Sequence, residues 1–263
     1  MRTSTTTLRL DPRLNGPLRS ANGGFAAGVI AQAVGGTASV RLVRPVPLHT
    51  ALEVETDVDR TSAQVTDPDH RLVAEATRVD PFTMTPPVRP GFAQAEAARA
   101  ASPLHGARHL LSGCVVCGPE RLDGLGVTPG PLPRRSDLLA APFVPQERDA
   151  ADGLVRPEAV WGALDCPSYP AAALLDRRLG LLGTMTAHLH RDVFVGERLV
   201  SIGWTLDGGH RATRTASALL EERGDVVASA RAVWVELKHQ WLVRLAGRVR
   251  RPTTVSVTSG GTP

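Results

Sequence analysis

Aromatic residues are scarce in this sequence, at 4% of 263 residues, and Tyr169 is its single tyrosine. This scarcity argues against a protein that binds nucleic acid by stacking bases on aromatic side chains. Lys238 is the only lysine, so nearly all of the positive charge is arginine. The net charge is +4 and the pI is about 9.6. We interpret this basicity as a compositional bias, because alanine, glycine, valine and proline are abundant too, and we predict no nucleic-acid partner.

Cysteine is also rare, with only Cys114, Cys117 and Cys166 in the chain. An odd, low number without an apolar N-terminal segment does not fit a secreted protein built on disulfides. Residues Met1 to Leu10 are rich in threonine and lack the hydrophobic region of a signal peptide. No run approaches the roughly 18 apolar residues that a membrane-spanning helix needs. We therefore expect a cytoplasmic protein with no membrane partner.

Two sequence patterns of common enzyme folds are missing as well. There is no Gly-x-Ser-x-Gly elbow, so an α/β-hydrolase is not supported. The Gly124-Leu-Gly126 pair lies outside any strand-helix-strand unit, so it does not indicate a dinucleotide site. Hydrophobic residues make up 42% of the chain, which is enough for a sizeable core without metals or crosslinks. The length allows one large domain or two small ones.

The strongest feature that is present is an internal repeat. The segment Arg44 to Val54 matches Arg191 to Ser201 at a constant offset of 147 residues. A second block, Leu72 to Ala76, matches Val226 to Ala230 at an offset of 154. The difference of seven residues falls between the blocks, where a hairpin can absorb it. Both blocks occur in the same order with strand-like alternation, so we predict two similar units.

The second copy reads as an antiparallel meander. Alternating residues predict strands over Val200 to Leu206, over Thr213 to Leu219 and over Val226 to Leu237, the last being the longest. Turn residues separate them, at Asp207 to Gly209 and at Glu222 to Asp225.

A helix rich in small residues precedes each meander. The first is expected over Gly24 to Val34, and the second from Pro157, a good first-turn residue, to Cys166. Neither has a wide polar face, so each is expected to be buried with a sheet wrapped around it. This pattern predicts an α+β fold of two fused hotdog units, each an antiparallel sheet around a central buried helix.

These elements set the expected domain organisation. We predict an N-terminal hotdog unit over 1–88 and a linker over 89–108. A C-terminal hotdog unit follows over 109–245, and a disordered tail over 246–263.

Two further motifs carry a family resemblance. The run from Val116 to Arg121, which includes Cys117-Gly118-Pro119, leads into Asp123-Gly124-Leu125. About 40 residues later comes Pro157 to Pro167, Pro-Glu-Ala-Val-Trp-Gly-Ala-Leu-Asp-Cys-Pro. Both pieces, in this order, resemble thioesterase-like hotdog proteins common in actinobacteria.

The first half of the sequence also resembles a hotdog family. Asn22-Gly23-Gly24 before the first helix, with Ala31-Gln32-Ala33 within it, looks like the N-terminal half of double-hotdog acyl-CoA thioesterases. The two resemblances together cover roughly Leu18 to Leu237. They imply the hotdog fold specifically. They imply an action on acyl thioesters less specifically, because the hotdog fold hosts several functions.

The resemblance implies a site at the helix ends. A hotdog thioesterase polarises the carbonyl with amides at a helix N-terminus, and Gly23 and Gly24 would let the acyl group approach that backbone. Asn22 either binds the carbonyl or only caps the helix, and related single-hotdog enzymes often have histidine there. Asp165 matches the family's attacking or activating carboxylate, unless it only caps the following turn. Gln32 could hold the water or the carbonyl, or could face the partner unit.

Two patterns typical of metal sites have simpler interpretations. His188 and His190 share one face of a strand, but no third ligand is evident and exposed histidines explain them. Cys114 and Cys117, with His105 and His109 nearby, resemble a zinc pattern. The family turn explains Cys117 without a metal. We therefore predict no metal and no cofactor.

We accordingly predict thioesterase-like hydrolysis of an acyl-CoA or acyl-carrier-protein thioester. The acyl chain would lie between the two units, in one composite site rather than two equivalent ones. Two alternatives stay open: a dehydratase or hydratase acting on acyl thioesters, or a double hotdog that binds acyl groups without chemistry. A fused pair already mimics a hotdog dimer, so the assembly is expected to be a monomer or a homodimer.

Overall fold

The structure is a computed structural model of the chain. It describes residues 3–16, 20–106, 111–119, 121–209, 211–238 and 240. The expected tail at 246–263, as well as His109, lies outside the described residues.

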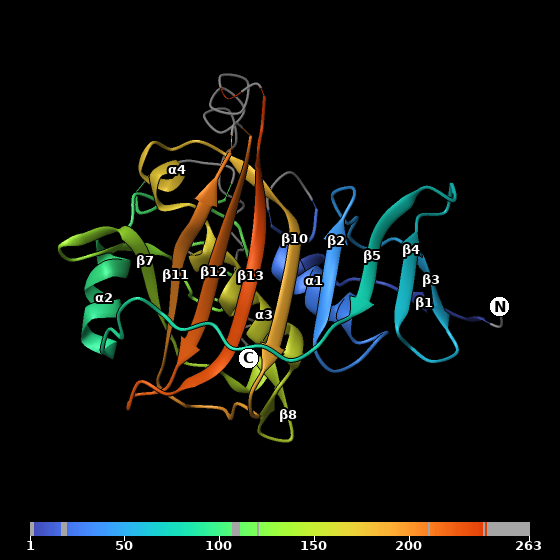
Figure 1. The fold of residues 1–263 in the computed structure, drawn as a ribbon, viewed down its shortest axis with the longest axis horizontal. Helices are drawn as coiled ribbons and strands as arrows, with labels where there is room; N and C mark the ends of the chain where they lie inside the picture. Colours follow the sequence, from blue (N-terminus) through green and yellow to red (C-terminus); the bar gives the residue numbers. More distant parts are fainter. Residues whose placement is uncertain are drawn as a thin grey trace, which may run out of the picture.

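One antiparallel sheet of eleven strands forms the body of the described structure (Figure 1). Its strand order is β1-β3-β4-β5-β2-β10-β13-β12-β11-β7-β6. The strands are β1 (Thr3–Leu8), β2 (Ala38–Leu42), β3 (Leu52–Asp57), β4 (Ser62–Thr66), β5 (Leu72–Arg78), β6 (Gly130–Leu132), β7 (Arg135–Phe143), β10 (Gly180–Leu189), β11 (Leu199–Gly208), β12 (Ala212–Leu220) and β13 (Val226–Glu236). The three strands predicted between Val200 and Leu237 are confirmed as β11, β12 and β13, and β13 is the longest.

The two halves of the sheet follow the same order outward from its centre. There β2 pairs with β10, with Ser39 opposite Thr186. Outward from this pair come β5, β4, β3 and β1 on one side, and β13, β12, β11 and β7 on the other. The matching blocks of sequence begin corresponding strands: Leu52 and Leu199 begin β3 and β11, and Leu72 and Val226 begin β5 and β13.

Two buried helices lie side by side on one face of this sheet (Figure 1). Helix α1 (Gly23–Ala31) is capped by Asn22, and helix α3 (Pro157–Asp165) begins at the proline that predicted it. Helix α1 ends earlier than expected, because Gly35 and Gly36 soon follow with positive φ angles of 68° and 63°, which a helix cannot accommodate. A sheet wrapped around two central helices is the double-hotdog arrangement that the sequence predicted.

Glycines allow α1 and α3 to pack in direct backbone contact. A Cβ on Gly24 would lie 2.3 Å from Cβ of Asp165, and a Cβ on Gly28 would lie 2.6 Å from Cα of Glu158. The start of α1 therefore meets the end of α3, and the middle of α1 meets the start of α3. The helices are antiparallel, and opposite ends of their dipoles face one another.

The segment expected as a linker contains a helix, α2 (Phe92–Ala100). It contacts β6, β7 and β11 and forms a second buried cluster with side chains such as Leu138, Val200 and Ile202. Leu199 belongs to the main core around α1 and α3. Helices thus cover both faces of the C-terminal half of the sheet, so its central strands are buried on both sides. In β3, by contrast, buried and exposed residues alternate.

Short elements complete the described chain. They are η1 (Pro12–Leu14), η2 (Glu147–Asp149), β8 (Ala150–Ala151), β9 (Leu154–Val155), η3 (Cys166–Ser168) and α4 (Ala171–Leu175). Within the described ranges, no helix has both the length and the apolar character needed to cross a membrane.

The close packing of the helices can be tested at Gly28. Gly28→Ala should lower the free energy of unfolding by about 2 kcal/mol, because overpacking against the Glu158 backbone costs about 3 kcal/mol, the upper end of the usual range, and the better helix propensity of alanine returns about 1 kcal/mol. Denaturant unfolding measures the change. Gly209→Ala is the control, because its added Cβ would approach no described atom more closely than 3.6 Å. Equal effects of the two substitutions would contradict this packing.

Candidate functional site

A cavity of about 290 Å³ lies where α1 begins and α3 ends. The ends of β2, β10 and β13 also border it, so both halves of the chain contribute to its walls. Most of its lining is apolar, including Val46, Leu182 and Trp234. Its polar groups are concentrated at the helix ends. They are contributed by Asn22, Gly23, Cys114, Cys117, Asp165 and Cys166.

Asn22 links the two helices from the N-cap position of α1. Its side-chain oxygen accepts a hydrogen bond from the Phe25 amide at 2.9 Å, which is the usual N-cap contact. Its side-chain nitrogen donates to Oδ2 of Asp165 at 2.9 Å. One amide group therefore caps α1 and also holds the Asp165 carboxylate. Binding of a substrate carbonyl by Asn22 stays a prediction.

Asp165 is the last residue of α3 and is only 1% exposed. Its Oδ2 also accepts from the Gly24 amide at 3.1 Å, so the carboxylate lies against the positive end of the α1 dipole. Its Oδ1 is buried and has no hydrogen-bond partner among the described residues. Burial raises the pKa of this carboxyl to about 7, although the Gly24 amide opposes the change.

The first amide of α1 is available for a ligand. The amides of Gly24, Phe25 and Ala26 all donate to protein acceptors. The Gly23 amide makes no hydrogen bond within the described chain, and Gly23 lines the cavity. A Cβ at this position would lie 2.9 Å from Cβ of Leu182, so a side chain would crowd the entrance to the amide.

Three buried cysteines complete the polar end of the cavity. The sulfur atoms of Cys114, Cys117 and Cys166 all lie within 4.8 Å of one another. Nδ2 of Asn22 lies 3.6 Å from Sγ of Cys114 and 3.9 Å from Sγ of Cys166. These residues do not form a group in the sequence, because Cys166 lies about 50 positions after the other two. The available signals were the Cys-x-x-Cys-Gly run and the position of Cys166 next to Asp165.

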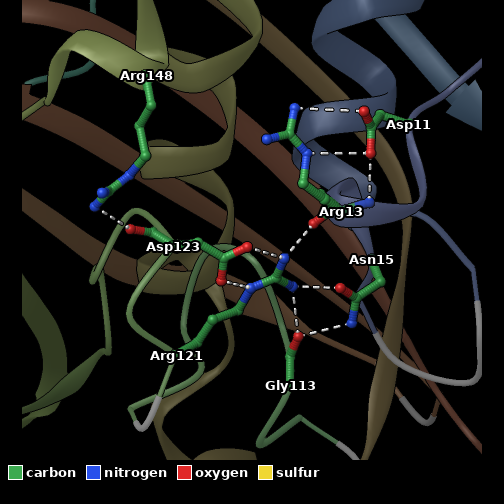
Figure 2. Close-up of polar contacts among 8 residues, drawn as sticks. Asp11, Arg13, Asn15, Gly113, Arg121, Asp123 and Arg148 are labelled. Atoms are coloured by element: carbon green, nitrogen blue, oxygen red, sulfur yellow. Dashed lines mark hydrogen bonds and ion pairs between the residues drawn. The ribbon is translucent and has the colours of Figure 1, made fainter. Parts of the chain in front are cut away.

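Arg121 holds the cysteine loop, residues 111–119, against the N-terminal segment (Figure 2). Its guanidinium donates to the side chain of Asn15, to the Gly113 carbonyl at 2.8 Å and to the Arg13 carbonyl at 2.6 Å. It also pairs with Asp123 at 2.7 Å. These contacts fix the loop relative to the chain that leads into Asn22.

Gln32 lies away from this cavity, at the C-terminal end of α1. Its Nε2 donates to Oε2 of Glu158 at 2.8 Å, at the start of α3. This end of the helix pair is the counterpart of the Asn22–Asp165 end, but it is exposed and Gln32 does not line the cavity. The structure brings together Asn22, Gly23, Gly24 and Asp165 and leaves Gln32 out.

The histidines considered as metal ligands also lie elsewhere. His188 contacts Thr37 at 2.6 Å, and His190 contacts Ser229 at 3.0 Å. His105 contacts the carbonyl of Arg99. Across the described ranges, no histidine lines the cavity or joins a cluster with metal-ligand spacing.

Comparison with known proteins shows the fold. No protein-family model and no curated protein matches the sequence. A protein provisionally named a thioesterase, from Novosphingobium aromaticivorans DSM 12444, has a TM-score of 0.61 at 16% identity, over 88% of this chain and 94% of that one. One provisionally named thioesterase II, from Thermobifida fusca YX, has a TM-score of 0.59 at 19% identity, over 89% and 94%. The 12:0-ACP thioesterase from Umbellularia californica has a TM-score of 0.51 at 12% identity, over 89% and 94%. These likenesses establish the hotdog fold over nearly the whole chain.

The Arg121 network provides a stability test. Arg121→Ala should destabilise the protein by about 1–3 kcal/mol, because it removes the hydrogen bonds that a mostly buried guanidinium makes to Asn15, Gly113 and Arg13, each worth about 0.5–1.5 kcal/mol. Arg135→Ala is the matched control, since Arg135 also pairs with the aspartate two residues on, but its side chain is 45% exposed against 12% for Arg121. The control should change stability by about 0.5 kcal/mol or less. Thermal unfolding of both variants measures the difference, and equal melting temperatures would contradict the role of Arg121.

Proposed function

We propose that this chain hydrolyses an acyl thioester carried by coenzyme A or by an acyl carrier protein. The observation that carries the proposal is the Asp165 carboxylate, held against the N-terminus of α1 at the polar end of an apolar cavity. The fold supports it, because structures with the same fold include proteins named as thioesterases, one of them for a 12:0-ACP substrate.

The acyl chain would occupy the apolar part of the cavity, with the thioester carbonyl at the start of α1. There the free Gly23 amide would donate a hydrogen bond to the carbonyl oxygen. The partial positive charge of the helix end would stabilise the negative charge that develops on this oxygen during attack.

Asp165 would direct the attacking water. Its Oδ1 has no protein partner in the described chain and would accept a hydrogen bond from the water. The water oxygen bonds to the carbonyl carbon while its proton passes to Asp165. The carbon–sulfur bond then breaks, the thiolate leaves as a thiol with that proton, and the carboxylic acid remains. No external oxidant or reductant is required.

Asn22 would act as a positioning residue. Its amide occupies Oδ2 of Asp165 and fixes the carboxylate plane, so that Oδ1 stays directed at the water site. Asn22 cannot transfer a proton. Asp165 alone would therefore accept the proton from the water, so the proposed reaction needs no histidine at position 22.

The base role can be tested by an isosteric change. Asp165→Asn keeps an oxygen for the Gly24 amide but removes the base, so kcat on a panel of acyl-CoA substrates should fall by about 100-fold or more. Glu158→Gln makes the same chemical change at the counterpart end of the helix pair, outside the cavity, and should leave kcat unchanged. Steady-state kinetics with circular dichroism of each variant measures both effects.

Three outcomes of this assay would contradict the proposal. Equal kcat for wild type and Asp165→Asn would remove Asp165 as the base. Binding of acyl-CoA without turnover by the wild type would favour a non-catalytic acyl-binding protein. Hydration of an enoyl thioester would favour a hydratase, although no histidine among the described residues lines the cavity to pair with Asp165.

Arg44 is the cationic side chain that we propose for the phosphates of a CoA substrate. It is exposed, borders the cavity and has no ion-pair partner among the described residues. Arg44→Ala should raise KM for acyl-CoA by about two- to fivefold, the effect of one exposed charge pair. KM for an acyl-pantetheine thioester, which lacks those phosphates, should not change.

Arg41→Ala is the matched control for Arg44. Arg41 is three residues away and exposed, but it pairs with Glu75 at 3.1 Å and does not line the cavity. The Arg44 effect should also shrink at high salt, because exposed charge pairs are screened. An equal rise in KM for both thioesters would contradict a phosphate contact.

We infer that the protein is a monomer or a homodimer, because one chain provides both walls of the cavity. We also infer that it acts in the cytoplasm without a nucleic-acid or membrane partner.

A further inference from the structure

The cysteine cluster of Cys114, Cys117 and Cys166 has the dimensions of a metal site. Their sulfur atoms lie within 4.8 Å of one another. Zinc–thiolate bonds are about 2.3 Å long, so thiolates in tetrahedral positions around one ion are separated by about 3.8 Å. The sulfur atoms therefore lie at most about 1 Å farther apart than around a bound ion. The role of Asp165 in the proposed hydrolysis does not use these thiols.

A tight turn holds Cys114 and Cys117 close together on the cysteine loop. The Gly118 amide donates to the Cys114 carbonyl at 2.9 Å and closes a tight turn over Cys114 to Cys117. A Cβ on Gly118 would lie 2.6 Å from the carbonyl oxygens of Cys114 and Ser112, so the turn requires glycine.

The third sulfur comes from a different part of the chain. Cys166 follows the last residue of α3 and begins η3, whereas the other two cysteines lie on the loop that Arg121 anchors. The side chain of Asn22 approaches both Cys114 and Cys166. All three cysteines line the cavity, so a fourth coordination position would open toward it.

We propose that Cys114, Cys117 and Cys166 bind one thiophilic divalent ion of the zinc class through their thiolates. Binding replaces three S–H bonds with three S–metal bonds and releases three protons, with no change in oxidation state. The fourth position takes a water from the cavity or a ligand within it. This departs from the expectation of a metal-free protein, which explained Cys117 by the family turn and did not include Cys166.

A disulfide is the rival use of the same sulfur atoms. It would join two of the three thiols, consume an oxidant that accepts two electrons, and leave the third buried thiol beside the bond. One ion uses all three and needs no oxidant. The observed convergence of three sulfur atoms therefore favours the ion.

The test uses the full-length protein, purified without chelator. Elemental analysis should find about one zinc per chain. The chelated, reduced protein should bind added Co²⁺ and show the sulfur-to-cobalt charge-transfer absorption and intense visible bands of a tetrahedral thiolate site. Removal of the ion should lower the melting temperature, because the ion binds the folded state.

Cys117→Ser and Cys166→Ser should each lose the ion and the cobalt absorption. Val116→Ala is the control, because it alters a buried side chain of the same loop and leaves all three thiols in place. A reduced wild-type protein with three free thiols that binds neither zinc nor Co²⁺ overturns the proposal, whether or not the serine variants fold. So does a disulfide that persists in the purified protein, or an ion retained by both serine variants.

Activity separates this inference from the proposed hydrolysis. A reduced wild type that neither holds nor takes up an ion, yet hydrolyses acyl thioesters, would overturn the metal site and leave the hydrolysis in place. A metal-loaded protein without thioesterase activity would do the reverse.

Discussion

The contact between Asp165 and the first turn of α1 is the interaction on which the site depends. It requires a carboxylate at the end of one buried helix and an uncrowded amide at the start of the other. Gly24 makes it possible, because any side chain there would occupy the position of Asp165. Burial alone would make an isolated carboxylate costly. The helix end, its Gly24 amide and the Asn22 side chain offset that cost, and they leave Oδ1 without a partner among the residues that the structure describes.

The two ends of the helix pair show how a repeated fold produces a single site. The antiparallel pair places a helix start beside a helix end twice. At one end the partners are Asn22 and Asp165, buried and bordered by the cavity. At the other they are Gln32 and Glu158, which form an exposed pair. The scaffold is alike at both ends, so burial and side-chain identity decide which end can perform chemistry.

The loop that carries Cys114 and Cys117 links the site to the rest of the chain. Arg121 ties this loop to the N-terminal segment through carbonyl groups and Asn15. The same segment leads into Asn22, whose amide contacts both the carboxylate and the sulfur atoms. The Asp165 carboxylate, the cap of α1 and the cysteine cluster are therefore joined through the contacts of Asn22.

The sequence by itself determined the fold class and the strands of the second unit, because alternation, turn residues and the repeat are local signals. It also singled out Asn22 and Asp165 through motif resemblance. Only the tertiary structure decided that these two residues share a cavity, that Gln32 lies at the opposite end, and that Cys166 joins Cys114. Those relations depend on the antiparallel packing of two helices far apart in the chain, and no local pattern encodes which helix ends meet.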